Sequence, residues 1–211
     1  MSVAIITDTV ACLPADVAGR LDIRVIPLQV IHKGVTYLDG VDMTADRFFE
    51  ILATSEELPT TSAPVPEAYV ALYEELIESG KEILVICPSY RLTHVFESAN
   101  IAAGLVREKR PGAVISVIDS GTAAGAQGFV ACEAARAAQA GASMAEVIAV
   151  ASNIMQRAIV IVFLDTLNYL VKGGRVPYIF GWANALLNIK PIIELKPLNQ
   201  GVVPLARVRT R

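Results

Sequence analysis

The amino-acid sequence predicts an α/β protein in which a mostly parallel sheet carries helices on both faces, followed by a second, incomplete α/β domain with antiparallel strands. Over the first ~155 residues, short apolar runs alternate with helical patterns, which is typical of parallel sheets. The helical segments are rich in alanine, whose small side chain permits close packing of helix on sheet. Near the end, the turn Asn199-Gln200-Gly201 separates two apolar runs, as in an antiparallel hairpin. We therefore expect domains at 1–156 and 157–211.

The first elements are marked by apolar runs and by the turn and capping residues between them. Glycine in Lys33-Gly34 tolerates the positive φ that a tight hairpin requires. Thr44 carries a side-chain oxygen that can accept from a free N–H of the first helical turn. The expected order is the strand Val3–Thr7, the helix Pro14–Leu21, the strand Ile23–Ile31, the hairpin turn and the helix Ala45–Ala53.

The middle of the chain continues the alternation. A helix is expected at Pro66–Ser79 because Tyr69, Tyr73 and Leu76 recur on one helical face and Gly80 can end the helix. After it we expect the strand Ile83–Cys87, the helix Thr93–Arg107, the strand Val114–Ile118, and the helices Ala123–Ala140 and Ser143–Gln156, which Gly141 divides.

The start of the C-terminal part, residues 158–174, has the patterns of a strand, a helix cap, a helix and a helix end in close succession. The β-branched run Ala158–Leu164 is short enough to be a buried strand. Asp165 stands where an N-cap residue belongs, and Leu167, Leu170 and Val171 follow at helical spacing. Gly173-Gly174 can end that helix. A second short helix and the strands Asn188–Leu195 and Val202–Val208 complete the prediction.

Composition excludes several classes of function. Of the 211 residues, 54% are apolar and 18% charged, and the net charge of -3 argues against a nucleic-acid partner. The sequence has no run of the ~20 apolar residues that a membrane span needs, so we expect no stable membrane insertion. The three cysteines are few and far apart, and the N-terminus lacks a leader pattern, which indicates the cytoplasm. Two histidines make a multi-histidine metal site improbable, so no metal is expected.

Polar residues after the strands are the candidate ligand groups, because α/β proteins bind ligands at that edge. Thr61 and Ser62 precede a helix that begins with proline, and helix N-termini attract anions. The alternative for Ser62 is a simple N-cap. Arg175 follows the double glycine, so a fixed turn would hold its planar cation, which suits a carboxylate or phosphate. A salt bridge or a partner for the helix end is the alternative for Arg175.

A second group of candidates lies before the helix at 93–107. Ser89 and Thr93 could complete an anion cradle with backbone amides, although Thr93 could equally cap its helix. His94 could bind a carboxylate when protonated, or it could be a solvated helix residue. A hydrolase or transferase that uses Ser89 or Ser120 as nucleophile, with His94 as base, is the alternative function.

Two further patterns are weak. Asp8 and Asp119 end strands and could form a carboxylate pair for acid–base work or Mg²⁺, but an aspartate there more often caps the next turn. The segment with Gly121, Gly125 and Gly128 lacks the spacing of a dinucleotide fingerprint and does not follow the first strand. No phosphate loop or nucleophile elbow is present.

Seven motifs, in order along nearly the whole chain, resemble the DegV family of bacterial fatty-acid-binding proteins. Those nearest the C-terminus are DTLNYLVKGGRV and LLNIKPII. The others are ITDTVACLP, VIPLQV with HKGVTYLDGVDMT, TTSAP, RLTHVFESA and VIDSGTAAGAQG. The sequence departs from the family where Leu92-Thr93-His94-Val95 replaces Leu-Ser-Gly-Thr, so that a histidine stands in place of a glycine. The family usually continues past the point where this chain stops, so we expect the C-terminal part to be missing.

The resemblance implies a lipid-binding carrier, not an enzyme, with no cofactor beyond its fatty acid. The carboxylate would be held by Thr61, Ser62, Ser89, Thr93, His94 and Arg175, and the acyl chain would lie in an apolar tunnel near the domain interface. Residues 1–156 would form the lipid-binding domain. The implied partner is a fatty-acid kinase that phosphorylates the bound carboxylate to an acyl phosphate. Arg207 and Arg209 are candidates for a basic surface on which that kinase docks.

Overall fold

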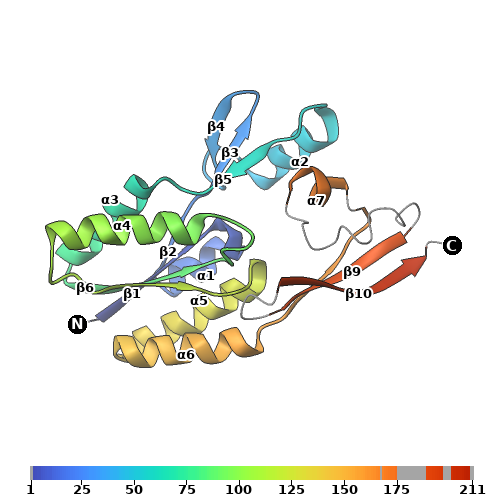
Figure 1. The fold of residues 1–211 in the computed structure, drawn as a ribbon. Helices are drawn as coiled ribbons and strands as arrows, with labels where there is room; N and C mark the ends of the chain where they lie inside the picture. Colours follow the sequence, from blue (N-terminus) through green and yellow to red (C-terminus); the bar gives the residue numbers. More distant parts are fainter. Residues whose placement is uncertain (1, 167, 175–188, 197–200, 210–211) are drawn as a thin grey trace.

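A four-stranded parallel sheet forms the centre of the computed structural model, which describes residues 2–166, 168–174, 189–196 and 201–209 (Figure 1). Its strands are β1 (Ser2–Asp8), β2 (Ile23–Ile26), β6 (Lys81–Cys87) and β7 (Ile115–Asp119), in the spatial order β2-β1-β6-β7. Every pair is parallel. The predicted parallel sheet is therefore confirmed.

Helices cover both faces of this sheet, as predicted (Figure 1). On one face lie α3 (Pro66–Glu78) and α4 (Val95–Lys109), and on the other α1 (Ala15–Arg20), α5 (Ala124–Gln139) and α6 (Met144–Arg157). Successive strand residues point to opposite faces. Ile6 accordingly packs with Tyr69 and Tyr73 of α3, whereas Ile5 packs with Val130 of α5. The sheet is thus buried on both sides.

The alanine-rich helix α5 approaches the end of β1 very closely. A Cβ on Gly128 would stand 2.7 Å from the backbone oxygen of Ala11 and 3.1 Å from Leu13. Ala11 belongs to η1 (Thr9–Ala11), a short 3₁₀ helix that follows β1. Gly128 therefore serves helix packing, which explains a glycine that resembled part of a nucleotide-binding pattern.

The single strand predicted for Ile23–Ile31 is wrong, because the chain leaves one sheet and enters another there. β2 ends at Ile26, opposite Asp8, the last residue of β1. Pro27, which has no N–H to donate to a ladder, follows it. β3 (Gln29–His32) then begins a second sheet with the order β4-β3-β5, where β4 is Val35–Leu38 and β5 is Thr60–Ser62. β5 replaces a predicted loop.

The hairpin between β3 and β4 and the helix after it are confirmed. Lys33 and Gly34 both have positive φ, 50° and 76°, as a tight hairpin turn requires. Thr44 Oγ1 accepts from the backbone N–H of Arg47 at 3.3 Å and caps α2 (Ala45–Thr54). None of the α2 side chains is fully buried.

The C-terminal elements form a third sheet in the order β10-β9-β8. Its antiparallel strands, including the pairing of β9 with β10, are as predicted, and β8 pairs with β9 in addition. Its strands are β8 (Val160–Phe163), β9 (Ile189–Lys196) and β10 (Gly201–Arg209), and α7 (Asn168–Lys172) lies between β8 and β9 in the chain. Asp165 forms an ion pair with Lys190 and does not directly precede α7, so it is not the N-cap residue. Gly173 N–H donates to Tyr169 O at 2.8 Å where α7 ends, as expected.

Some predictions concern residues that lie outside the described part of the chain, and the predicted domain boundary is not tested by the structure. Leu167, the turn at 199–200, most of the second short helix and Arg175 lie outside the described residues. The domain boundary at 156/157 stays a prediction. In the described part of the chain, none of the helices has the length and apolar character needed to cross a bilayer.

Candidate functional site

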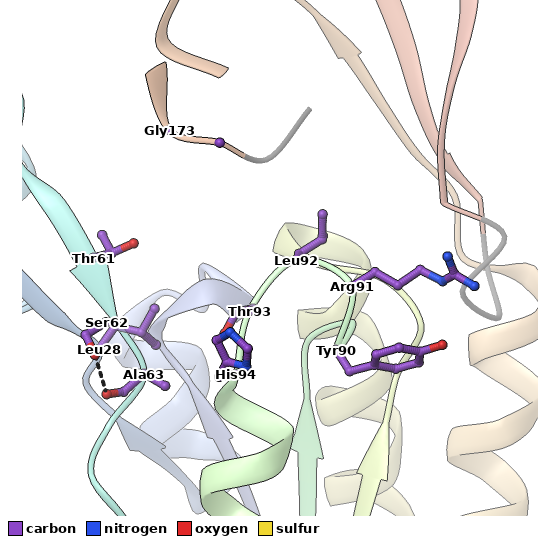
Figure 2. A pocket seen from close by; sticks show the side chains of 11 residues that line it. Leu28, Thr61, Ser62, Ala63, Tyr90, Arg91, Leu92, Thr93, His94 and Gly173 are labelled. Carbon is purple, nitrogen blue, oxygen red and sulfur yellow. Dashed lines mark hydrogen bonds between the residues drawn. The ribbon is translucent and has the colours of Figure 1, made fainter. Parts of the chain in front are cut away.

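A cavity of about 490 Å³ opens where the second sheet, the loop after β6 and the end of α7 meet (Figure 2). It brings together residues that are far apart in the chain, among them Thr61, Ser62, Arg91, Thr93, His94 and Gly173. Its volume falls within the roughly 300–1,000 Å³ of small-molecule sites. Four of the six predicted carboxylate-binding residues, Thr61, Ser62, Thr93 and His94, line it. We call it the polar cavity.

One wall of the polar cavity is the edge strand β5. Pairing with β3 sets its register, Val30 opposite Thr61 and Gln29 opposite Ser62. Ser62 is exposed, and its hydroxyl donates to Ala63 O at 3.3 Å. The N-cap position of α3 is Val65, so the alternative that Ser62 merely caps this helix is wrong. A weakly bonded hydroxyl on the cavity wall is free to turn toward a ligand.

The opposite wall is the loop that joins β6 to α4. Thr93 Oγ1 accepts from Val95 N–H at 3.0 Å, so this hydroxyl does support the helix start, while its own proton can still be donated. His94 occupies the N-cap position of α4. Its Nδ1 lies 2.8 Å from Glu97 Oε2, and its side chain is 86% exposed. His94 therefore faces solvent at the rim of the cavity.

Ser89 and Ser120 are buried and have structural partners. Ser89 N–H donates to Thr122 O at 2.7 Å, and Ser89 Oγ accepts from Arg91 N–H at 3.3 Å. Ser120 Oγ donates to Thr122 O at 3.5 Å. Ser89 thus shapes the loop behind the cavity and is not among the cavity-lining residues. Among the described residues, His94 is bonded to Glu97 and to neither Ser89 nor Ser120, and the serine that does meet a histidine, Ser55 with its Oγ 3.1 Å from His32 Nε2, is not one of the predicted nucleophiles. No observation therefore favours the hydrolase alternative.

Arg91 lines the polar cavity and was missed in the sequence analysis. Its guanidinium carbon lies 5.7 Å from the centre of the Tyr90 ring, and Figure 2 shows the side chain extending away from Thr61 and Ser62. The available signal was a cation beside hydroxyl residues in a loop after a strand. Gly173 and Gly174 also line the cavity, whereas the predicted ligand Arg175 lies outside the described residues.

A second cavity, of about 410 Å³, adjoins the first between α2 and α7. Its lining is mainly apolar: Phe48 and Leu52 from α2, Leu58 and Pro59 from the following loop, and Tyr169 from α7. Thr61 and Gly173 line both cavities. We call this second one the apolar cavity. A polar and an apolar compartment that share a boundary suit an amphipathic ligand.

Asp8 and Asp119 do not form a carboxylate pair. They end β1 and β7, and β6 lies between these strands. Asp119 Oδ1 accepts from Gly121 N–H at 2.8 Å and Asp8 Oδ1 from Val10 N–H at 2.9 Å, so both hold the turn that follows. Among the described residues, no group of three or more acidic, histidine or cysteine side chains could hold a metal ion.

Asp8 has an unusual environment. It is 1% exposed, and Gln127 Nε2 donates to its Oδ2 at 2.9 Å. Burial raises the pKa of Asp8 from 3.8 to about 7, against the opposing effects of the Val10 N–H and Gln127 donors. The folded protein therefore holds a proton here that the unfolded chain releases between about pH 4 and pH 7.

The chain is similar to known proteins and structures over nearly its whole length. The model of the family described as "Uncharacterised protein, DegV family" matches residues 2–211. A DegV domain-containing protein of Clostridium perfringens is 32% identical over 211 residues, which cover 100% of this chain and 74% of that protein. Protein DegV of Bacillus subtilis is 34% identical over 212 residues, covering 100% of this chain and 73% of that protein.

Solved structures also match nearly the whole of this chain. The structure described as fatty-acid binding of a DegV family protein from Thermus thermophilus matches with a TM-score of 0.88 and 31% identity, covering 100% of this chain and 72% of that chain. A stearic-acid-binding protein from Eubacterium ventriosum matches with a TM-score of 0.90 and 27% identity, covering 98% of this chain and 71% of that one.

Asp8 yields a prediction about stability. Because its folded pKa lies above its unfolded value, ionisation disfavours folding as the pH rises, and the effect levels off above the folded pKa. We expect the free energy of unfolding to fall by about 2–3 kcal/mol between about pH 5 and pH 8. In Asp8→Asn, which keeps an acceptor for Val10 N–H, this slope should vanish. Urea denaturation at several pH values between about 5 and 8 measures the free energy of unfolding of both proteins. The same dependence on pH in wild type and Asp8→Asn would contradict the prediction.

Proposed function

This chain belongs to the DegV family, and from that membership we propose that it binds one long-chain fatty acid, with the carboxylate in the polar cavity and the acyl chain in the apolar cavity. One observation carries the proposal: the two compartments share Thr61 and Gly173 as a common boundary. A fatty acid is the simplest molecule with that division. The solved relatives described as fatty-acid or stearic-acid binding support the choice of ligand.

The acyl chain supplies most of the affinity in this proposal. Each buried methylene contributes ~0.8 kcal/mol, so a chain of about sixteen carbons has more than enough to offset its loss of freedom on binding. Phe48, Leu52, Leu58 and Tyr169 offer the apolar surface that it would cover. Few polar groups are then needed for affinity, and those that contact the carboxylate set the orientation of the bound fatty acid.

The carboxylate is held mainly by hydroxyl groups. Thr61 and Ser62 from β5 and Thr93 from the opposite wall converge on the polar cavity, and hydroxyl donors to an ionised carboxylate make strong hydrogen bonds (Figure 2). Arg175 adds positive charge, and His94 at the rim of the cavity is a hydrogen-bond partner for the carboxylate when its imidazole is protonated. Ser89 acts indirectly, by fixing the loop that carries Thr93: the Thr93 N–H donates to Ser89 O at 3.3 Å.

We propose further that the chain is a carrier that presents its fatty acid to a fatty-acid kinase. The carboxylate oxygen would attack the γ-phosphorus of ATP, the bond from phosphorus to ADP would break, and an acyl phosphate would form. The carboxylate lies at the open end of the site in this arrangement, because the exposed residues Ser62 and His94 line the polar cavity. The chain itself supplies no phosphate-binding loop. Arg207 and Arg209 on β10 are the proposed docking surface.

The first test concerns the carboxylate. We expect mass spectrometry of the solvent extract of purified protein to find a near-stoichiometric fatty acid of about 14–18 carbons, as the burial per methylene favours long chains. Ser62→Ala should weaken oleate binding about tenfold to a hundredfold, the value of one hydrogen bond to a charged group, without loss of stability. Ser79→Ala, which removes an exposed hydroxyl at the end of α3, is the matched control. An empty extract with no uptake of oleate would reject fatty-acid binding.

The second test concerns the acyl chain. Leu52→Glu places a charge in the apolar cavity, and we expect oleate binding to fall by a factor of at least about 100, because an acyl chain that covers a carboxylate displaces its water and cannot replace those hydrogen bonds, even with Lys172 on the same cavity wall. Leu105→Glu, on the exposed side of α4, should bind as the wild type does. Titration with a fluorescent fatty acid and displacement by oleate gives both affinities. Equal binding by the two variants would place the acyl chain elsewhere.

The third test concerns the kinase. With ATP, magnesium and a bacterial fatty-acid kinase, the loaded protein should yield acyl phosphate, which hydroxylamine traps as a hydroxamate. The double variant Arg207→Glu and Arg209→Glu should slow this reaction while leaving oleate binding unchanged. Arg20→Glu with Arg136→Glu, two exposed arginines on α1 and α5, is the control. Unchanged phosphorylation in the β10 variant rejects the docking surface, and no product from the wild type rejects the carrier role.

A further inference from the structure

We propose that Gln127, a fully buried residue of α5, is a positioning residue that fixes the spacing between the two walls of the polar cavity. The inference rests on the proposed function, because its consequence is measured as fatty-acid affinity. Gln127 does not line the cavity. It acts through the ends of β1 and β6, which are connected to the opposite walls by the Thr9–Leu28 hydrogen bond and by the loop after β6.

The side-chain amide of Gln127 joins the two strands directly. Its Nε2 donates to Thr7 Oγ1 at 3.0 Å and to Asp8 Oδ2 at 2.9 Å, both at the end of β1. The same nitrogen lies 3.3 Å from Ile86 O near the end of β6, and Thr7 Oγ1 donates to that oxygen at 2.9 Å. Gln127 is 0% exposed, so water does not compete for these bonds.

From β1 the connection reaches the wall that carries Thr61 and Ser62. Asp8 Oδ1 fixes the start of η1 through Val10 N–H, and Thr9 Oγ1, in η1, accepts from Leu28 N–H at 3.2 Å. Leu28 lines the polar cavity and immediately precedes β3. β3 pairs with β5, where Gln29 stands opposite Ser62. Each step is a hydrogen bond or a covalent neighbour.

From β6 the connection reaches the wall that carries Thr93 and His94. Ile86 is followed by Cys87, Pro88 and Ser89, and Ser89 O accepts from Leu92 N–H at 2.9 Å and from Thr93 N–H at 3.3 Å. The loop before α5 holds this segment as well, since Ser89 N–H donates to Thr122 O. Gln127 and Thr122 thus tie α5 to both cavity walls.

The amide oxygen of Gln127, Oε1, gives this side chain an acceptor beside its donor nitrogen. Its Oε1 is buried and has no hydrogen-bond partner in the described structure. When Asp8 is protonated, a flipped amide accepts a hydrogen bond from the Asp8 O–H with Oε1, and it then loses the Nε2 bonds to Thr7 Oγ1, Asp8 Oδ2 and Ile86 O. The strand ends would then be joined less tightly. The state of the Asp8–Gln127 pair would set how firmly the walls are held.

The other titratable groups around Asp8 do not compete with it near neutral pH. Cys12 follows η1, Cys87 ends β6 and Tyr69 comes from α3, and Asp8 acts electrostatically on all three. Burial is the main cause that raises the pKa of each of these groups, so they remain neutral. The charge of Asp39 also raises the pKa of Cys12, and the charge of Asp119 that of Cys87. Asp8 is therefore the group of this cluster that titrates.

The test replaces Gln127 by methionine, which has a similar size and no hydrogen-bond donor. We expect Gln127→Met to weaken oleate binding about tenfold or more. Gln139→Met is the matched control, because Gln139 lies on the same helix and donates to Arg20 O at 3.2 Å but is exposed. Thr9→Val, which breaks only the link to Leu28, should also weaken binding and serves if Gln127→Met does not fold.

Two results separate this inference from a general loss of packing. Removal of the Gln127 donor should raise the pKa of Asp8 further, so the fall in stability with pH should extend to higher pH in Gln127→Met. This shift shows that the bond at the strand ends is broken, and a loss of oleate affinity in the same variant then assigns the positioning role to that bond. Equal affinity of wild type and Gln127→Met, or equal losses in Gln127→Met and Gln139→Met, would overturn the positioning role. A wild type that binds no oleate would instead overturn the proposed function.

Discussion

The parallel pairing of β1 with β6 is the constraint on which the rest of the structure depends. Parallel neighbours end at the same edge of a sheet, so the loops that follow must leave from one place. The segment after β1 forms η1, whose Thr9 is bonded to Leu28 at the start of the second sheet, and the loop after β6 leads to Thr93 and α4. The two walls of the polar cavity face each other because these strand ends are neighbours.

The parts of this arrangement that could be predicted are those with a strong local signal. The β-branched runs, the alanine-rich helices, the Thr44 cap and the Lys33-Gly34 hairpin each specify their own structure through a few neighbouring residues. The parallel sheet followed from their alternation. The hydroxyl residues Thr61 and Thr93 could be named because each follows or precedes a recognisable element.

What could not be predicted depends on partners far away in the sequence. Pro27 was a local signal that one ladder could not run through Ile23–Ile31, but the entry into a second sheet depends on β4 and β5, which pair with β3 and lie later in the chain. β5 is strand only because β3 pairs with it, although its sequence resembles a loop. Gln127 meets Thr7 and Asp8 across 120 and 119 positions of chain. Arg91 had a local signal, a cation in a loop with hydroxyl residues, but the local sequence does not show that Arg91 lines the cavity.

The helix α2 has a sharply divided apolar and polar character, yet it buries no side chain completely. Phe48 and Leu52 point their apolar surface at a cavity of about 410 Å³ instead of at a packed core. An acyl chain in that space would be, in energetic terms, the missing layer of this helix's own hydrophobic core. Without a bound acyl chain, the apolar face of α2 would lack part of its packing partner, so the stability of this helix would depend on the supply of fatty acid.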